Sequence, residues 1–107
     1  MEREEVIKLW DLFECDFLGL RVEGEVVRER MEEIIMKKGK VAVLDFEGVR
    51  GITHAFADEV VGIFTSAFGK EWVQRNVRVI NANENVKFIL NLAVKLRLRQ
   101  SQRKETD

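Results

Sequence analysis

Six side chains in this sequence are the candidates for a chemical role: Cys15, Asp45, Thr53, His54, Asp58 and Glu59. A thiol and an imidazole together could form a nucleophile and its base, and the adjacent acids Asp58 and Glu59 could transfer protons. A structural role suits each residue better, since a half-buried thiol is inert and acids in the first turn of a helix are stabilised by its dipole. We therefore expect no catalytic residue and no enzymatic activity.

The sequence lacks the residues that usually bind metal ions and nucleotides. Cys15 and His54 are the only cysteine and the only histidine, and they stand 39 positions apart, so they cannot complete a tetrahedral metal site. The segment Gly48-Val49-Arg50-Gly51 lacks the lysine and the hydroxyl of a phosphate-binding loop. We expect neither a metal nor a cofactor.

The composition fits one small domain. The chain has 107 residues, 46% of them hydrophobic, and a net charge of −1, so the whole molecule offers no attraction to nucleic acid or to anionic lipid. The acidic start at residues 1–5 is unlike a secretory signal, and no apolar stretch is long enough to cross a bilayer. With a single cysteine, these features favour a cytoplasmic protein that binds neither nucleic acid nor membrane.

Hydrophobic periodicity predicts strands and helices in alternation. We expect strands over 4–13, 41–46 and 77–81, and helices over 22–38, 53–68 and 84–99. Alternation at this spacing implies right-handed crossovers and a mainly parallel sheet, in which the apolar strand 41–46 would be central and covered on both faces. Residues 1–99 would form the domain and 100–107 a polar tail.

Functional residues of parallel sheets gather at the carboxyl ends of the strands. In this sequence that edge comprises residues 15–24, 47–56 and 81–84. Asp45 would hold the neighbouring loop in shape, Thr53 would cap the second helix and Asn83 the last one. The basic stretch 95–104 is interpreted as a solvated helix end rather than a nucleic-acid site.

The segment 41–62 resembles a STAS-like family of unknown function. The resemblance rests on Asp45-Phe46-Glu47-Gly48-Val49 and on Phe56-Ala57-Asp58-Glu59, with further similarity in residues 17–21 and 80–86. It implies an α/β STAS-like domain with a mainly parallel or mixed sheet of about four strands and three main helices. It also implies a relationship to the bacterial anti-sigma-factor antagonists.

In those antagonists a serine at the start of the second helix is phosphorylated by a partner kinase, which breaks the complex. Here Thr53-His54-Ala55 replaces the usual Asp-Ser-Ser, so the phosphoacceptor serine is missing and Thr53, slightly upstream of it, is the candidate phosphoacceptor. Capping of the second helix is an equally good role for Thr53. The resemblance implies a regulatory module that docks a kinase-like or anti-sigma-like protein. The expected contact residues are Gly51, Thr53, His54, Phe56 and Asp58, with Arg21 and Asn83 on neighbouring loops.

Two alternatives stay open. The same edge could bind a small ligand or nucleotide, as parallel α/β sheets often do. The chain could also form a homo-oligomer through the apolar excess of its last helices or through an open sheet edge.

Overall fold

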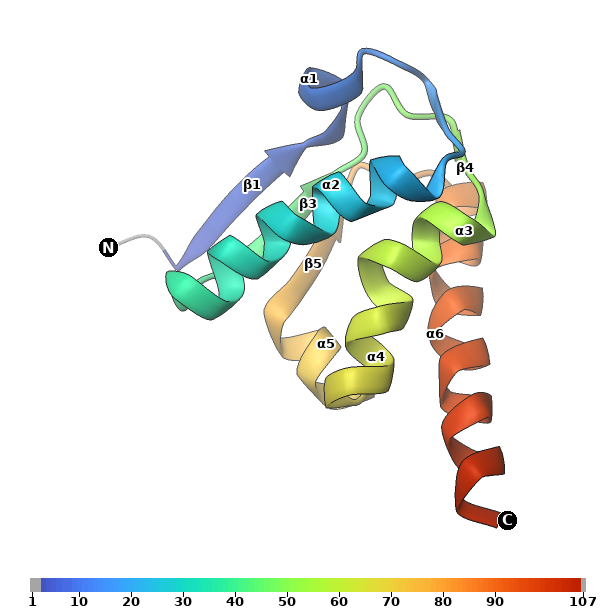
Figure 1. The fold of residues 1–107 in the computed structure, drawn as a ribbon. Coiled ribbons are helices and arrows are strands. Elements are labelled where there is room, and N and C mark those ends of the chain that lie inside the picture. Colours follow the sequence, from blue (N-terminus) through green and yellow to red (C-terminus); the bar gives the residue numbers. More distant parts are fainter. Residues whose placement is uncertain (1–2, 107) are drawn as a thin grey trace.

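The computed structural model describes the backbone of residues 3–106 and the side chains as far as Ser101. Figure 1 shows an alternation of strands and helices along the chain. The elements are β1 (Glu4–Lys8), α1 (Leu9–Phe13), β2 (Phe17–Leu18), α2 (Arg21–Glu32), β3 (Val41–Asp45), β4 (Gly51–Ile52), α3 (His54–Ala57), α4 (Ile63–Phe68), α5 (Lys70–Asn76), β5 (Val77–Ile80) and α6 (Glu84–Thr106). A π-helical turn, η1 (Glu33–Lys37), extends α2, and a second, η2 (Asp58–Gly62), joins α3 to α4.

The main sheet has three parallel strands in the order β1-β3-β5, which confirms the α/β class and the parallel connections. β3 is central, as the apolar run predicted, and the register sets Val6, Val43 and Arg78 side by side. A separate ladder pairs β2 with β4 through Phe17 and Gly51. The strand count therefore differs from the expected single sheet of about four.

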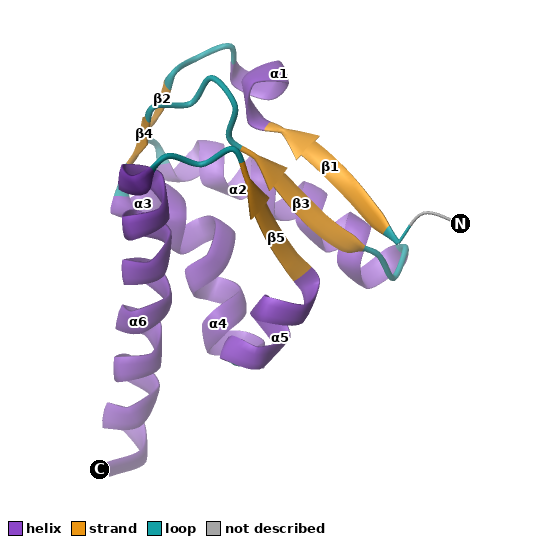
Figure 2. Cartoon of the chain, turned by 180° about the vertical axis from the view of Figure 1, so that it is seen from behind, coloured by secondary structure: helices purple, strands orange, loops and turns teal. Residues whose placement is uncertain are grey.

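The helices cover one face of this sheet. Figure 2 shows the sheet from the side opposite α2 and α4, and no helix within residues 3–106 crosses that side. The expectation that β3 is covered on both faces is therefore wrong. Val43 is 2% exposed although it is not part of the main core, and its register partners on the flanking strands, Val6 and Arg78, are exposed. The core lies between sheet and helices, with Leu9, Leu44, Phe46, Phe56, Val60 and Phe64 among its buried side chains.

Two short helices were not predicted. The strand expected over 4–13 ends at Lys8, because Leu9, Leu12 and Phe13 have helical spacing and α1 turns them onto the core. Gly69, with a φ of 95°, then separates α4 from α5. Trp72 of α5 packs on the rings of Phe64 and Phe68, at centroid distances of 5.3 and 4.5 Å.

The three main helices agree closely with the sequence pattern. α2 with η1 covers 21–37, and α3, η2 and α4 run without a break over 54–68. α6 continues to Thr106, past the expected end near Arg99, while residue 107 lies outside the described residues. Within the described part of the chain, no helix combines the length and the apolarity needed to cross a bilayer.

Candidate functional site

The first turn of α3 is fixed by the hydroxyl of Thr53. Its Oγ1 accepts a hydrogen bond from the N–H of Phe56 at 3.2 Å and donates one to the carbonyl oxygen of Gly19 at 2.8 Å. The first bond satisfies one of the free N–H groups at the helix start, which confirms the predicted cap. The second ties α3 to the loop that precedes α2.

Two further side chains shape the neighbouring loops. Asn83 caps α6 by accepting from Val86 N at 2.8 Å, and its amide donates to the carbonyl oxygen of Arg50 at the same distance. Asp45 Oδ1 accepts from Glu47 N and from Asn81 Nδ2, both at 3.0 Å. The predicted cap at Asn83 and the predicted loop-holding role of Asp45 are confirmed.

An aromatic ring lies beside this helix start. Phe17 is 53% exposed, yet its inner side rests on two glycines. A Cβ added at Gly51 would lie 2.9 Å from Phe17 Cδ1, and one added at Gly19 would lie 3.0 Å from Cε2 and 3.3 Å from Thr53 Cγ2. Leu20, 61% exposed, follows in the same segment. We name the surface formed by Phe17, Leu20, Thr53 and His54 the docking surface, because docking is the role that we propose for it.

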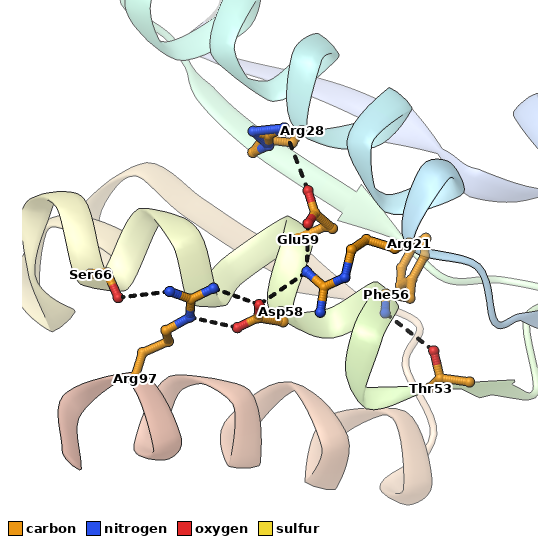
Figure 3. Close-up of polar contacts among 8 residues, drawn as sticks. All are labelled: Arg21, Arg28, Thr53, Phe56, Asp58, Glu59, Ser66 and Arg97. Carbon is orange, nitrogen blue, oxygen red and sulfur yellow. Dashed lines mark hydrogen bonds and ion pairs between the residues drawn. The ribbon is translucent and has the colours of Figure 1, made fainter. Parts of the chain in front are cut away.

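Behind this surface, η2 presents two buried carboxylates to arginines of the helices on either side (Figure 3). Arg97 of α6 donates two hydrogen bonds to Asp58, from Nε to Oδ1 at 2.7 Å and from Nη2 to Oδ2 at 2.6 Å. Arg21 of α2 adds a third bond to Oδ2 at 3.2 Å. This paired, bidentate geometry is the strongest that an arginine and a carboxylate can form.

Glu59 completes the network on the side of α2. It accepts from Arg21 at 2.6 Å and forms an ion pair with Arg28 at 3.4 Å. Gly24 permits this approach of α2, because a Cβ there would lie 2.6 Å from Glu59 Cβ. Gly62 permits the approach of Arg97, because a Cβ there would overlap Oδ1 of Asp58. The network therefore joins α2, η2 and α6.

The network stabilises the charged forms of Asp58, Arg21 and Arg97. The hydrogen bonds from Arg97 lower the pKa of Asp58; burial opposes this, and the bond from Arg21 assists it. The bonds to Glu59 and Asp58 raise the pKa of Arg21, and the bonds to Asp58 raise the pKa of Arg97. At neutral pH Asp58 is therefore an ion held by fixed positive charges, which is unsuited to accepting a proton.

The same residues border a cavity of about 530 Å³, which we name the basic cavity. It is lined by Arg21, His54, Asp58, Leu96, Arg97, Arg99 and Gln100. Among the residues that the structure describes there, three arginines face one carboxylate, which gives this part of the lining a net charge of +2 with the histidine neutral. Arg21, His54 and Asp58 were predicted from the sequence, but the residues of α6 were missed. The interpretation of stretch 95–104 as only a solvated helix end is wrong for Arg97, which is paired with Asp58.

A second cavity, of about 370 Å³, lies at the predicted strand-end edge. It is lined by Lys8, Trp10, Asp11, Asp16, Asp45, Glu47 and Gly48. One lysine faces four carboxylates, so this lining has a net charge of −3. Among the side chains that the structure describes, no group of histidine, cysteine or acidic residues is arranged to hold a metal ion.

The seven predicted contact residues divide by exposure. Arg21, His54 and Asn83 are exposed and Thr53 is half-buried, so all four can face a partner. Gly51, Phe56 and Asp58 are buried, which corrects their assignment as contact residues. Phe56 packs in the core because it follows the cap by three residues and its side chain turns inward with the first helical turn. Phe17, the exposed ring, was missed because a Phe-Leu pair gives no sign of which side chain is buried.

Comparison with known proteins identifies a family. The model of a family described as a STAS-like domain of unknown function (DUF4325) matches residues 23–87. The matched range includes η2 and the Thr53 cap but ends before Arg97. No curated protein and no solved structure matches the chain.

Proposed function

The chain belongs to the family of STAS-like domains of unknown function, and from that premise we propose that it is a non-enzymatic regulatory module that docks a partner protein at the docking surface. The partner class that the anti-sigma-factor antagonists suggest is a kinase-like or anti-sigma-like protein. The compartment that we propose is the cytoplasm.

The observation that carries the proposal is the placement of Phe17. An aromatic side chain that is half exposed and rests on a rigid support can bury a large area in a complex at little cost in side-chain entropy. Phe17 has that support, because Gly51 and Gly19 leave no space beneath the ring. Leu20 adds exposed apolar area in the same segment, and the capped start of α3 lies beside it.

A role without catalysis is supported by the occupation of the reactive groups. The thiol of Cys15 donates to the carbonyl oxygen of Phe17 at 3.1 Å, and the carboxylate of Asp58 is held by two arginines. A general base needs a free lone pair within reach of its substrate. In this arrangement both residues have structural partners instead.

Thr53 is the proposed point of regulation. A phosphate on its Oγ1 would remove the hydrogen that the carbonyl oxygen of Gly19 accepts, and would add about two negative charges within the docking surface. Both effects would release a partner that fits the unmodified surface. The half-buried position of Thr53 means that a kinase would need the loop before α2 to open locally.

The experiment is affinity capture from the source cell with matched variants. Phe17→Ala removes the proposed anchor, and Phe88→Ala is the control because Phe88 is 64% exposed on α6, outside the docking surface. A centrally placed anchor contributes on the order of 2 kcal/mol or more, so the partner's affinity should fall about thirtyfold for Phe17→Ala. A partner retained equally by both folded variants would refute the proposal.

A small-ligand or nucleotide sensor at the strand ends is the second candidate. Trp10, 42% exposed at the strand-end cavity, favours it by offering a ring on which a ligand could stack. The net negative lining opposes nucleotides, because their phosphates would meet four carboxylates. Thermal-shift measurements with a nucleotide panel test this second candidate, since a sensor would be stabilised by its ligand, and no stabilisation by any nucleotide would exclude a nucleotide sensor.

A further inference from the structure

We propose that the basic cavity binds the phosphate group of a phosphorylated serine or threonine on the partner protein. This inference rests on the proposed function and names the chemistry of the partner. Arg21 directly follows Leu20 and His54 directly follows Thr53, so the basic cavity adjoins the docking surface. A partner on that surface would have its phosphate within reach of the cavity.

The charge of the cavity matches a phosphate monoester. The lining carries a net charge of +2, and a phosphoserine or phosphothreonine carries about −1.5 to −2 at neutral pH. The one carboxylate in the lining, Asp58, already has both oxygens bonded to arginines, so its charge is compensated before a ligand arrives. A single carboxylate of an acidic peptide would neutralise only half of the remaining charge.

Donors for the phosphate remain after the network has formed. Arg99 is exposed and forms no ion pair among the residues that the structure describes. Arg21 is bonded to the carboxylates only through Nη1, which leaves its other nitrogens for a ligand. Planar guanidinium groups suit phosphate oxygens because they can donate two parallel bonds. His54 and Gln100 provide further polar groups at the rim.

The lining favours a phosphate attached to a protein over a free nucleotide. Pockets for small organic ligands are mostly apolar, and they enclose most of the ligand. Among the described residues of the lining, Leu96 is the only apolar one, so no apolar wall would enclose a base or bury a sugar. A phosphorylated side chain needs no such wall, because the rest of its binding surface lies outside the cavity.

The test is an NMR titration of the purified full chain, following backbone amides and arginine Nε–H resonances. The probes are an acetylated Gly-phosphoserine-Gly amide, its unphosphorylated form and inorganic phosphate. The phosphopeptide should give saturable shifts at Arg21, His54 and Arg99 and bind at least about tenfold more tightly than the unphosphorylated peptide. The titration needs no partner, so a negative titration would not contradict the docking proposal. A failure to capture a partner at the docking surface would not contradict the phosphate site.

Arg99→Ala should weaken the phosphopeptide about tenfold or more, since one charge-assisted donor is removed. The variant should fold normally because Arg99 is exposed and unpaired among the described residues. Arg75→Ala on α5 is the control, an exposed arginine outside the cavity. Equal binding of both peptides, shifts elsewhere, or an unchanged affinity in Arg99→Ala would each overturn the proposal. Inorganic phosphate binding as tightly as the phosphopeptide would overturn the assignment to a phosphoprotein.

Discussion

Replacing Asp58 with asparagine removes the charge at the centre of the ion-pair network without changing the size of the side chain. The Asp58 side chain is 7% exposed and accepts three hydrogen bonds, two from Arg97 and one from Arg21. The asparagine would have one acceptor oxygen, and its NH₂ group would face guanidinium N–H groups. The variant would leave Arg97 without the counter-ion that holds α6 against η2, while Arg21 would keep its bond to Glu59.

The expected loss is about 2–3 kcal/mol of unfolding free energy. Removing one partner of a fully buried ion pair costs about 3–5 kcal/mol, mainly because the other charge is left without water. Here the arginine side chains of Arg21 and Arg97 are 49% and 27% exposed, so both can turn partly to solvent, which reduces the loss. For a domain of this size the melting temperature should fall by roughly 10–15 °C.

The assay is urea unfolding followed by circular dichroism, with Glu4→Gln as the matched control. Glu4 pairs with Arg78, but their side chains are 43% and 54% exposed, so the control should lose less than about 1 kcal/mol. The double variant of Asp58→Asn with Arg97→Gln should lose less than the sum of the two single variants. If Asp58→Asn loses no more stability than Glu4→Gln, the network does not join the helices as argued.

Three further predictions concern the same region. The folded state lowers the pKa of Asp58, so the contribution of this carboxylate to the free energy of unfolding is full above the ordinary aspartate pKa of about 3.9 and is lost as pH falls through the lowered pKa. The difference in stability between wild type and Asp58→Asn should therefore disappear in acid. A difference that does not change with pH would contradict this. Gly24→Ala should destabilise the fold, although alanine favours helices, because its Cβ would meet Glu59; a rise in melting temperature would show that α2 is packed more loosely. Thr53→Ala should cost about 1 kcal/mol in urea unfolding while Thr53→Ser keeps the cap, and equal losses in both would exclude capping by the hydroxyl.

The three main helices, the parallel strands of the main sheet and two helix caps could be predicted from the sequence because their causes are local. Apolar residues at helical spacing marked α2 and α6, and the continuous apolar run at Val41–Asp45 marked the central strand. Thr53 and Asn83 bond to N–H groups three residues ahead, so residue type and position sufficed to predict both caps. The Asp-Phe-x-Gly-Val and Phe-Ala-Asp-Glu segments were sufficient to identify the family.

The basic cavity and the ion-pair network were decided by the tertiary structure. Asp58 and Glu59 looked like ordinary acids of a first helical turn, and Arg97 looked like a solvated cation of a helix end. Their partners stand 31 to 39 positions away in the sequence, and no local pattern couples residues at that distance. The glycines at 24 and 62 were the available sign, because glycine inside a helix often marks a close approach.

The exposure of individual side chains could likewise not be predicted from the sequence. The amino-acid sequence determined that Phe56 and Phe17 are both aromatic, but only the fold turned Phe56 into the core and left Phe17 on the surface. Within residues 3–106 it also left one face of the sheet without a helix, although the apolar strand β3 is typical of a strand covered on both faces. Local interactions determine which elements form and where they begin. Which side chains meet across those elements depends on how the whole chain packs, because that packing alone sets the distances between segments far apart in sequence.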